Sequence, residues 1–125
     1  MKLHSDSFDV PSVSGYGPGW VAVSGEKVHT SVVIGSRGQR LAWDCAQFAD
    51  LTAAHFTLLA GLNAELVVFG SGNRLRFPRP EWLKALVEKR IGIETMDTQA
   101  ACRTYNILAG EGRNVVTALL IESPA

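Results

Sequence analysis

The sequence predicts an α/β fold, a three-layer domain with a central mixed, largely parallel sheet flanked by helices and an N-terminal β-hairpin. Short apolar runs alternate with helical patterns after residue 50, which favours strands joined by helical crossovers. Two early β-branched segments flank a turn. A length of 125 residues suits one hydrophobic core, so we expect a single domain over residues 1–125.

The composition is that of a packed domain, with 46% hydrophobic and 19% charged residues. Twelve Lys and Arg balance twelve Asp and Glu, so the positive field that attracts nucleic acid is missing and we expect no nucleic-acid partner. No apolar run approaches the ~18 residues of a membrane span, and residues 1–6 lack the pattern of a secretory leader. We therefore expect no direct membrane insertion and a cytoplasmic location.

The first part of the chain predicts extended structure. Residues 1–19 are rich in Gly and Pro and predict an extended arm. Residues 20–23 and 28–34 flank a turn at 24–27, and residues 28–34 alternate at the strand period, which predicts a β-hairpin. Residues 41–43 predict a further short extended piece.

Two elements follow the hairpin. A first helix is expected to begin after Asp50 or Thr52, either of which can accept a hydrogen bond from a free N–H, and to end at Gly61. Residues 65–69 form a nearly continuous apolar run, typical of a strand covered on both faces.

The remaining elements continue the alternation. Pro80 opens a second helix with an apolar stripe at Trp82, Leu83, Leu86 and Val87. Residues 91–94 predict a strand. A third helix, capped by Asp97 or Thr98, is expected to run to about Ala109 and to stop at Gly110. Residues 115–121 are apolar or threonine and predict a buried, central strand.

A candidate site lies where two of these strands end. Ligands of open α/β sheets bind beyond the carboxyl ends of the strands, where helix N-termini offer free N–H groups. The residues at these positions, together with one arginine that could clamp a carboxylate or phosphate, are Gly70, Ser71, Gly72, Asn73, Arg76, Asp97 and Thr98. The competing interpretation is that the glycines only form a tight turn beside a solvated loop.

Nucleotide and nucleophile motifs are incomplete at this site. Leu75 stands where G-x-G-x-x-G needs glycine, and the Walker pattern is missing, so we expect no cofactor. Ser71 and Thr98 have no histidine or lysine nearby in sequence to act as a base, so we expect no catalytic residue.

Metal and thiol chemistry also find little support. His4, His29 and His55 show no helical i, i+4 spacing, and Cys45 and Cys102 form no C-x-x-C pair, so we expect no metal site. Cys102 is expected to be buried against the sheet; the alternative is a thiol with a lowered pKa near a helix start. Glu111 and Arg113 are expected to form an ion pair or a cap at the opposite end of the sheet.

Several motifs together resemble a known family. They are residues 69–72, 76–78, 92–98, 100–108 and 111–113, with weaker matches at 15–17 and Trp43. The chain resembles the domain-of-unknown-function family numbered 498, whose relatives include a mitochondrial respiratory complex I assembly factor and an adipogenesis-associated protein. The resemblance implies an α/β/α-type domain without a known reaction. The family commonly has Gly-Thr-Gly where this chain has Ser71 in the middle.

Two functional hypotheses follow. The leading one is a non-enzymatic accessory or assembly module that binds another protein and is mostly monomeric. The alternative is an anionic small-molecule binder or enzyme that uses the crevice around residues 70–73 and 97–98.

Overall fold

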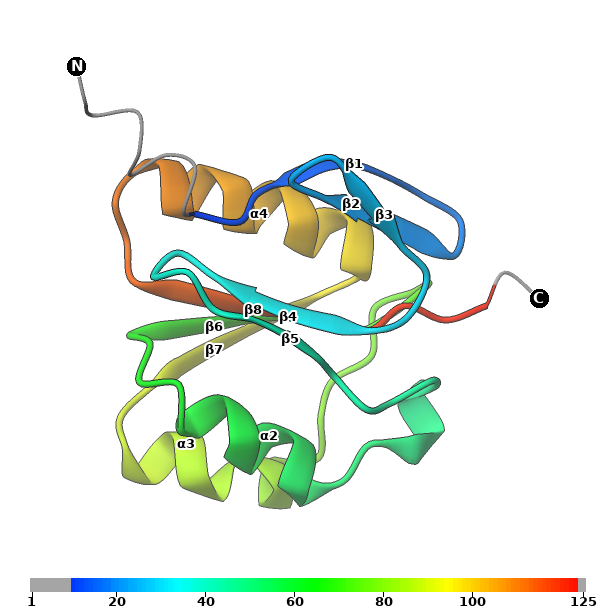
Figure 1. Cartoon of the computed structure of the whole chain (residues 1–125). Coiled ribbons are helices and arrows are strands. Elements are labelled where there is room, and N and C mark those ends of the chain that lie inside the picture. Colours follow the sequence, from blue (N-terminus) through cyan, green and yellow to red (C-terminus); the bar gives the residue numbers. More distant parts are fainter. Residues whose placement is uncertain (1–9, 124–125) are drawn as a thin grey trace.

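A computed structural model describes residues 10–123, which form two sheets and several helices (Figure 1). The main sheet has five strands in the order β5-β4-β8-β6-β7, with bounds β4 Val32–Gly35, β5 Arg40–Ala42, β6 Leu66–Gly70, β7 Gly92–Met96 and β8 Val115–Leu119. A smaller antiparallel sheet has the order β1-β2-β3, with bounds β1 Val13–Gly17, β2 Trp20–Val23 and β3 Glu26–Val28.

The main sheet is mixed, as predicted, and β8 is its middle strand, also as predicted. It is not largely parallel. β6 pairs in parallel with β7 and β8, whereas β4 pairs antiparallel with β5 and β8. The β4–β5 pair is antiparallel because a short turn joins β4 directly to β5, and such a turn cannot make a parallel crossover.

Helices cover both faces of the main sheet (Figure 1). On one face lie α4 (Thr98–Gly110) and the three-stranded sheet; their shared core includes Val21, Val68 and Tyr105. On the other lie α2 (Ala53–Ala60), α3 (Lys84–Glu88) and the 3-10 helices η1 (Phe48–Asp50) and η2 (Pro80–Leu83). Their core is built around Phe56 and Phe69, whose rings meet edge to face with centroids 5.2 Å apart.

The predicted N-terminal β-hairpin is confirmed, but the predicted bounds of its second strand are wrong. β2 and β3 do pair, but the expected second strand over residues 28–34 is divided between two sheets: β3 ends at Val28 and β4 starts at Val32. The chain crosses between the sheets at Ser31, whose hydroxyl accepts a hydrogen bond from the Ile121 N–H at 2.8 Å. Part of the expected arm is a strand, β1, while its residues 1–9 lie outside the described part of the chain.

The helix boundaries also refine the predictions. Thr52, not Asp50, precedes α2, and Asp97, not Thr98, caps α4 by accepting the Ala100 N–H at 2.9 Å. The second helix begins at Pro80 as a 3-10 turn, and Val87 is 69% exposed, outside the apolar stripe. Gly110 still belongs to α4; Gly112, with φ +81°, forms the left-handed turn beyond it.

Candidate functional site

The end of β6 packs closely against the start of α4. A Cβ added at Gly70 would lie 3.0 Å from the Cα of Thr98 and 3.0 Å from the Cβ of Ala101. These distances are shorter than ordinary van der Waals contact, so glycine at this position permits the close approach of strand and helix. The two predicted parts of the site therefore adjoin each other.

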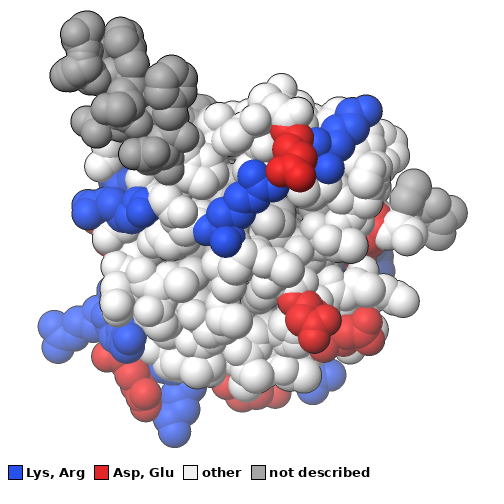
Figure 2. Space-filling model, viewed as in Figure 1, with Lys and Arg blue, Asp and Glu red and all other residues white. Residues whose placement is uncertain are grey.

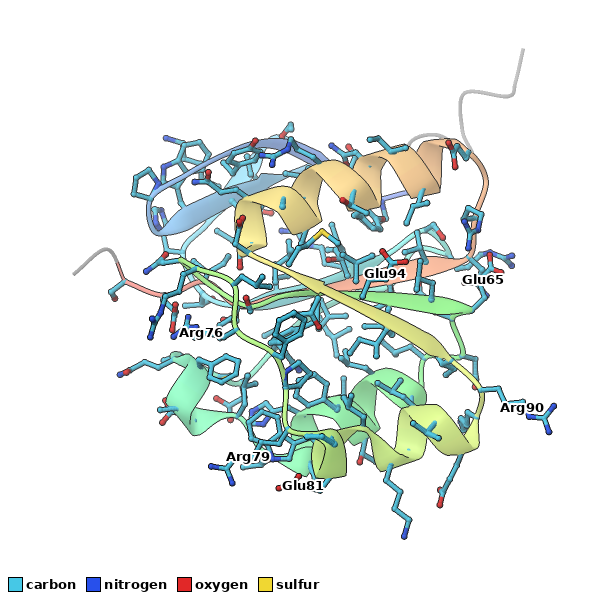
Figure 3. The ribbon with its side chains drawn as sticks, turned by 180° about the vertical axis from the view of Figure 1, so that it is seen from behind. Glu65, Arg76, Arg79, Glu81, Arg90 and Glu94 are labelled. Atoms are coloured by element: carbon cyan, nitrogen blue, oxygen red, sulfur yellow. The ribbon has the colours of Figure 1, made fainter. Side chains whose placement is uncertain are left out.

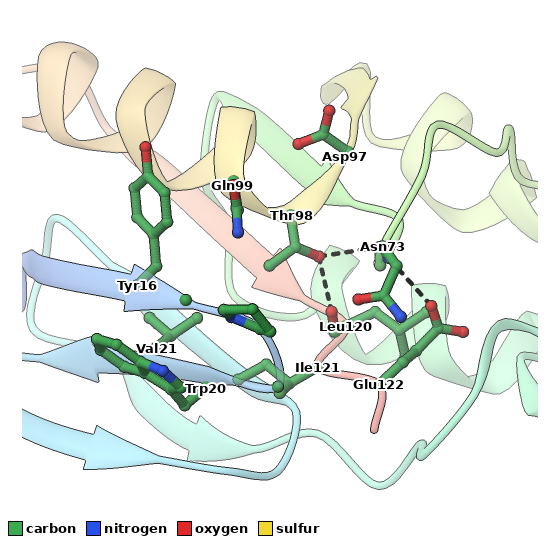
Figure 4. Close-up of a pocket in the computed structure, with 14 residues that line it drawn as sticks. Tyr16, Trp20, Val21, Asn73, Asp97, Thr98, Gln99, Leu120, Ile121 and Glu122 are labelled. Atoms are coloured by element: carbon green, nitrogen blue, oxygen red, sulfur yellow. Dashed lines mark hydrogen bonds between the residues drawn. The ribbon is translucent and has the colours of Figure 1, made fainter. Parts of the chain in front are cut away.

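Thr98 is a junction between three segments. Its Oγ1 accepts a hydrogen bond from the Gly72 N–H at 2.9 Å and donates one to the Leu120 carbonyl at 2.7 Å (Figure 4). Its own N–H donates to the Gly72 carbonyl at 3.0 Å. The side chain is buried, and its hydroxyl joins α4 both to the β6 loop and to the end of β8.

Ser71 closes the loop that follows β6. Its buried hydroxyl donates to the Arg74 carbonyl at 2.7 Å and accepts the Arg76 N–H at 3.0 Å. Its N–H donates to the Met96 carbonyl at 2.8 Å, which extends the pairing of β6 with β7 by one bond. Serine has the same hydroxyl as the threonine expected from the resemblance, and this hydroxyl holds the turn.

Arg76 and the loop amides bind a carboxylate of the chain itself. The guanidinium forms an ion pair with Glu122 and donates to the Ser71 carbonyl at 2.8 Å. The Asn73 N–H donates to Oε1 of Glu122, and the Phe48 N–H donates to Oε2, each at 3.1 Å. Two of the donors that the sequence suggested for an external anion, Arg76 and the Asn73 N–H, are therefore bonded to Glu122.

The surroundings of Glu122 determine its ionisation. Burial acts to raise the pKa of this carboxyl, but the hydrogen bonds from the Phe48 and Asn73 N–H groups and from Arg76 outweigh burial and lower the pKa below its usual value of 4.5. Arg76 also lies over the Phe48 ring, 4.8 Å from the centroid. The carboxylate thus stays ionised at neutral pH and holds three segments together.

Two hollows adjoin this junction. One, of about 270 Å³, lies between the β1–β2 turn and the start of α4 (Figure 4), and its lining includes Asp97 and Glu122 but no Lys or Arg. The other, of about 480 Å³, lies beside Arg74, Arg76 and Glu122. The first is near the ~300 Å³ lower limit of ligand pockets, and its carboxylates disfavour an anion.

The sequence reasoning missed Glu122 and the Leu120 carbonyl. Glu122 lies 46 residues from Arg76 along the chain, and a single glutamate after an apolar strand carries no motif. In the sequence, the one signal for this contact is the arginine beside the glycine loop. It indicates a carboxylate partner without indicating which carboxylate.

His55 and Cys102 have structural roles. Within residues 10–123, no group of three His, Cys, Asp or Glu residues could hold a metal ion, and His4 lies outside this range. His55 bonds through Nε2 to the Asp44 carbonyl at 2.7 Å, and its Nδ1 accepts the Thr52 N–H at 3.0 Å. Burial raises the pKa of Cys102 to about 12, so the expected burial of this thiol is confirmed.

The far end of the sheet is closed by a separate contact. Arg113 Nε lies 3.1 Å from Glu65 Oε1, so this ion pair joins the start of β8 to that of β6, while Glu111 caps α4.

On the face shown in Figure 2, charged side chains of both signs are scattered without a continuous basic area. Among the described helices, none is long and apolar enough to cross a membrane.

Comparison with known proteins places the chain in a family. The family model described as "Protein of unknown function (DUF498/DUF598)" matches residues 13–120 of this chain. The chain belongs to this family. The resemblance inferred from the motifs is thus confirmed.

The chain is also similar to named relatives and to solved structures. Over 84 residues the chain is 38% identical to bovine (Bos taurus) NADH dehydrogenase (ubiquinone) 1 alpha subcomplex assembly factor 3, which covers 66% of this chain and 45% of that protein. The chain thus spans about half the length of this relative. A Bordetella parapertussis crystal structure, 38% identical, superposes with a TM-score of 0.84 over 90% of this chain and 96% of that one. A Bordetella pertussis solution structure described as an Mth938-like domain, 32% identical, also gives 0.84, over 100% and 95%.

Proposed function

We propose that this chain is a non-enzymatic accessory or assembly module that binds another protein. The observation that carries the proposal is its 38% identity, over 84 residues, to a protein named as an assembly factor of NADH dehydrogenase. The matched region is 45% of that relative. The proposal therefore goes no further than protein binding as the class of function. A subunit of a respiratory NADH dehydrogenase is the first partner to test.

The geometry of the strand-end loop supports this proposal over a small-molecule site. The hydroxyls of Ser71 and Thr98 are engaged within the chain, and Arg76 is neutralised by Glu122. In contrast, Leu75 and Phe77 of the same loop are 52% and 68% exposed. Large apolar side chains that are held on the outside of a fixed loop are suited to contact a protein partner.

Capture from cells under gentle lysis tests the proposal. We expect the tagged chain to recover the same protein in repeated experiments. Phe77→Ser should reduce that recovery, whereas Val87→Ser, at a side chain of α3 with nearly the same exposure, 69%, should not. Repeated recovery of the tagged chain alone would count against a protein-binding function.

We further propose that the protein acts as a monomer in the cytoplasm. A balanced net charge and a self-contained core require no second copy. Light scattering tests the first statement and cell fractionation the second; a stable dimer or a membrane-bound fraction would contradict them.

A further inference from the structure

The β7 strand forms one edge of the main sheet. It pairs on one side only, with β6, in an unbroken register from Leu66 opposite Gly92 to Gly70 opposite Met96. Figure 3 shows the edge from behind, with Glu94 between α4 and the sheet. In the described part of the chain, no strand pairs with its other side.

The hydrogen bonds to β6 show which backbone groups face outward. The Gly92 N–H donates to the Glu65 carbonyl, and the Met96 carbonyl accepts the Ser71 N–H. Alternate residues of a parallel strand face the same neighbour, so Gly92, Glu94 and Met96 face β6. Ile93 and Thr95 therefore direct their N–H and C=O groups away from the sheet.

The opposite edge of the sheet differs in ways that block strand addition. β5 has three residues, against five in β7. Its Arg40 forms an ion pair with Glu26 of β3, with 2.6 Å between Nη2 and Oε1. Short length is a common protection of an edge strand, and the ion pair also ties β5 to β3. β7 has neither a bulge nor a proline, and its charged side chain is Glu94.

We propose that β7 binds an extended segment of a partner protein by strand addition, with a lysine or arginine of that segment facing Glu94. Glu94 is exposed and belongs to none of the ion pairs of residues 10–123. Opposite charges on neighbouring strands attract, and like charges repel. A second copy paired antiparallel about Glu94 would face it with another Glu94, which disfavours self-pairing.

The neighbours of Glu94 define the rest of the segment. The residues on either side of the basic one would lie beside Ile93 and Thr95, which are half-buried. Such positions favour β-branched side chains. The partner segment thus combines one basic residue with flanking valine, isoleucine or threonine, and this inference rests on the proposed protein-binding function.

Displayed random peptides of about ten residues, the length of a long strand, test the proposal on the full chain. Thr95→Pro removes an outward N–H, a change that an edge strand tolerates. Ala42→Pro is the matched control on β5, because the bonds of Gly35 and Trp43 to the neighbouring residues also place the Ala42 N–H outward. Glu94→Lys reverses the charge without touching the backbone.

We expect enriched peptides to carry a basic residue between β-branched ones and to slow amide exchange at Ile93 and Thr95. Their affinity should fall about tenfold or more, ~1.4 kcal/mol, in Thr95→Pro and in Glu94→Lys, and stay unchanged in Ala42→Pro. Equal binding to all four proteins, no enrichment, or a dimer that Thr95→Pro dissociates would overturn the proposal. If a cellular partner binds Thr95→Pro normally, strand addition at β7 is overturned but the proposed function is not. If peptides bind but no cellular partner is found, the proposed function is overturned but strand addition at β7 is not.

Discussion

The hydroxyl of Thr98 donates a hydrogen bond to the Leu120 carbonyl at 2.7 Å and so joins the first turn of α4 to the end of β8. Thr98→Ala removes this bond and leaves the buried Gly72 N–H without its acceptor. We expect the free energy of unfolding in urea to fall by about 1–3 kcal/mol. Thr98→Ser, which keeps the hydroxyl, should lose much less. Thr104→Ala, at a half-buried position of the same helix, is the control, and an equal loss there would contradict the assigned role.

Gly72 combines a left-handed backbone, φ +101°, with a close approach of the Glu122 carboxylate, which an added Cβ would overlap. Gly112 has φ +81° and no atom within 4 Å of such a Cβ. Gly112→Ala should therefore show the backbone cost alone, about 1–2 kcal/mol, and Gly72→Ala a larger loss. Thermal unfolding of both variants checks this, and equal losses would show that Glu122 moves aside freely.

The lowered pKa of Glu122 predicts a pH dependence of stability. Because the folded-state pKa lies below 4.5, the unfolded chain binds the proton more readily. The stabilisation from this carboxylate is complete above pH 4.5 and is lost as the pH falls through the folded pKa. Glu122→Gln should be less stable than the wild type near pH 7, by about 1.5–3 kcal/mol, and the difference should shrink in acid.

Urea unfolding at a series of pH values measures this difference. Glu65→Gln is the control, because hydrogen bonds from Arg113 and the Asn114 N–H also lower the pKa of Glu65, but at an exposed pair. Its effect should be much smaller. A difference between Glu122→Gln and wild type that does not change with pH would mean that Glu122 acts through its shape instead of its charge.

The two thiols should be unreactive in the folded protein. Burial raises the pKa of Cys102 to about 12 and also raises that of Cys45, and only the thiolate reacts with alkylating reagents. Iodoacetamide at about pH 8 should leave Cys102 unmodified in the native chain and label both cysteines in urea. Mass spectrometry of digested samples reads both sites. Rapid native labelling of Cys102 would show that α4 opens readily.

Local patterns predicted most elements correctly. The apolar run before Gly70 and the run after residue 114 are strands, and the capping residues before α2 and α4 lie within the predicted pairs. These features depend on residues close together in sequence. The change of sheet at Ser31 does not, because Val28 and Val32 have the same alternating pattern although they pair with different strands.

The candidate site shows the same limit. Gly70, Ser71, Gly72, Asn73, Arg76, Asp97 and Thr98 do gather at one end of the sheet, as the alternation of strands and helices indicates. Ligand binding by these residues stays a prediction. Two of their bonding partners, Glu122 and the Leu120 carbonyl, lie far away in the sequence and are brought there by the fold of the whole chain. No pattern within a short window contains that information.

The middle position of β8 has a consequence for synthesis of the protein. β4 and β6 both pair with β8, and β8 is the last of the described strands in the sequence. While a ribosome has made only the residues before Val115, the β4–β5 hairpin and the β6–β7 unit have no strand to join them. The main sheet therefore closes only after translation of β8, and until then the edges of β4 and β6 are open in addition to those of β5 and β7.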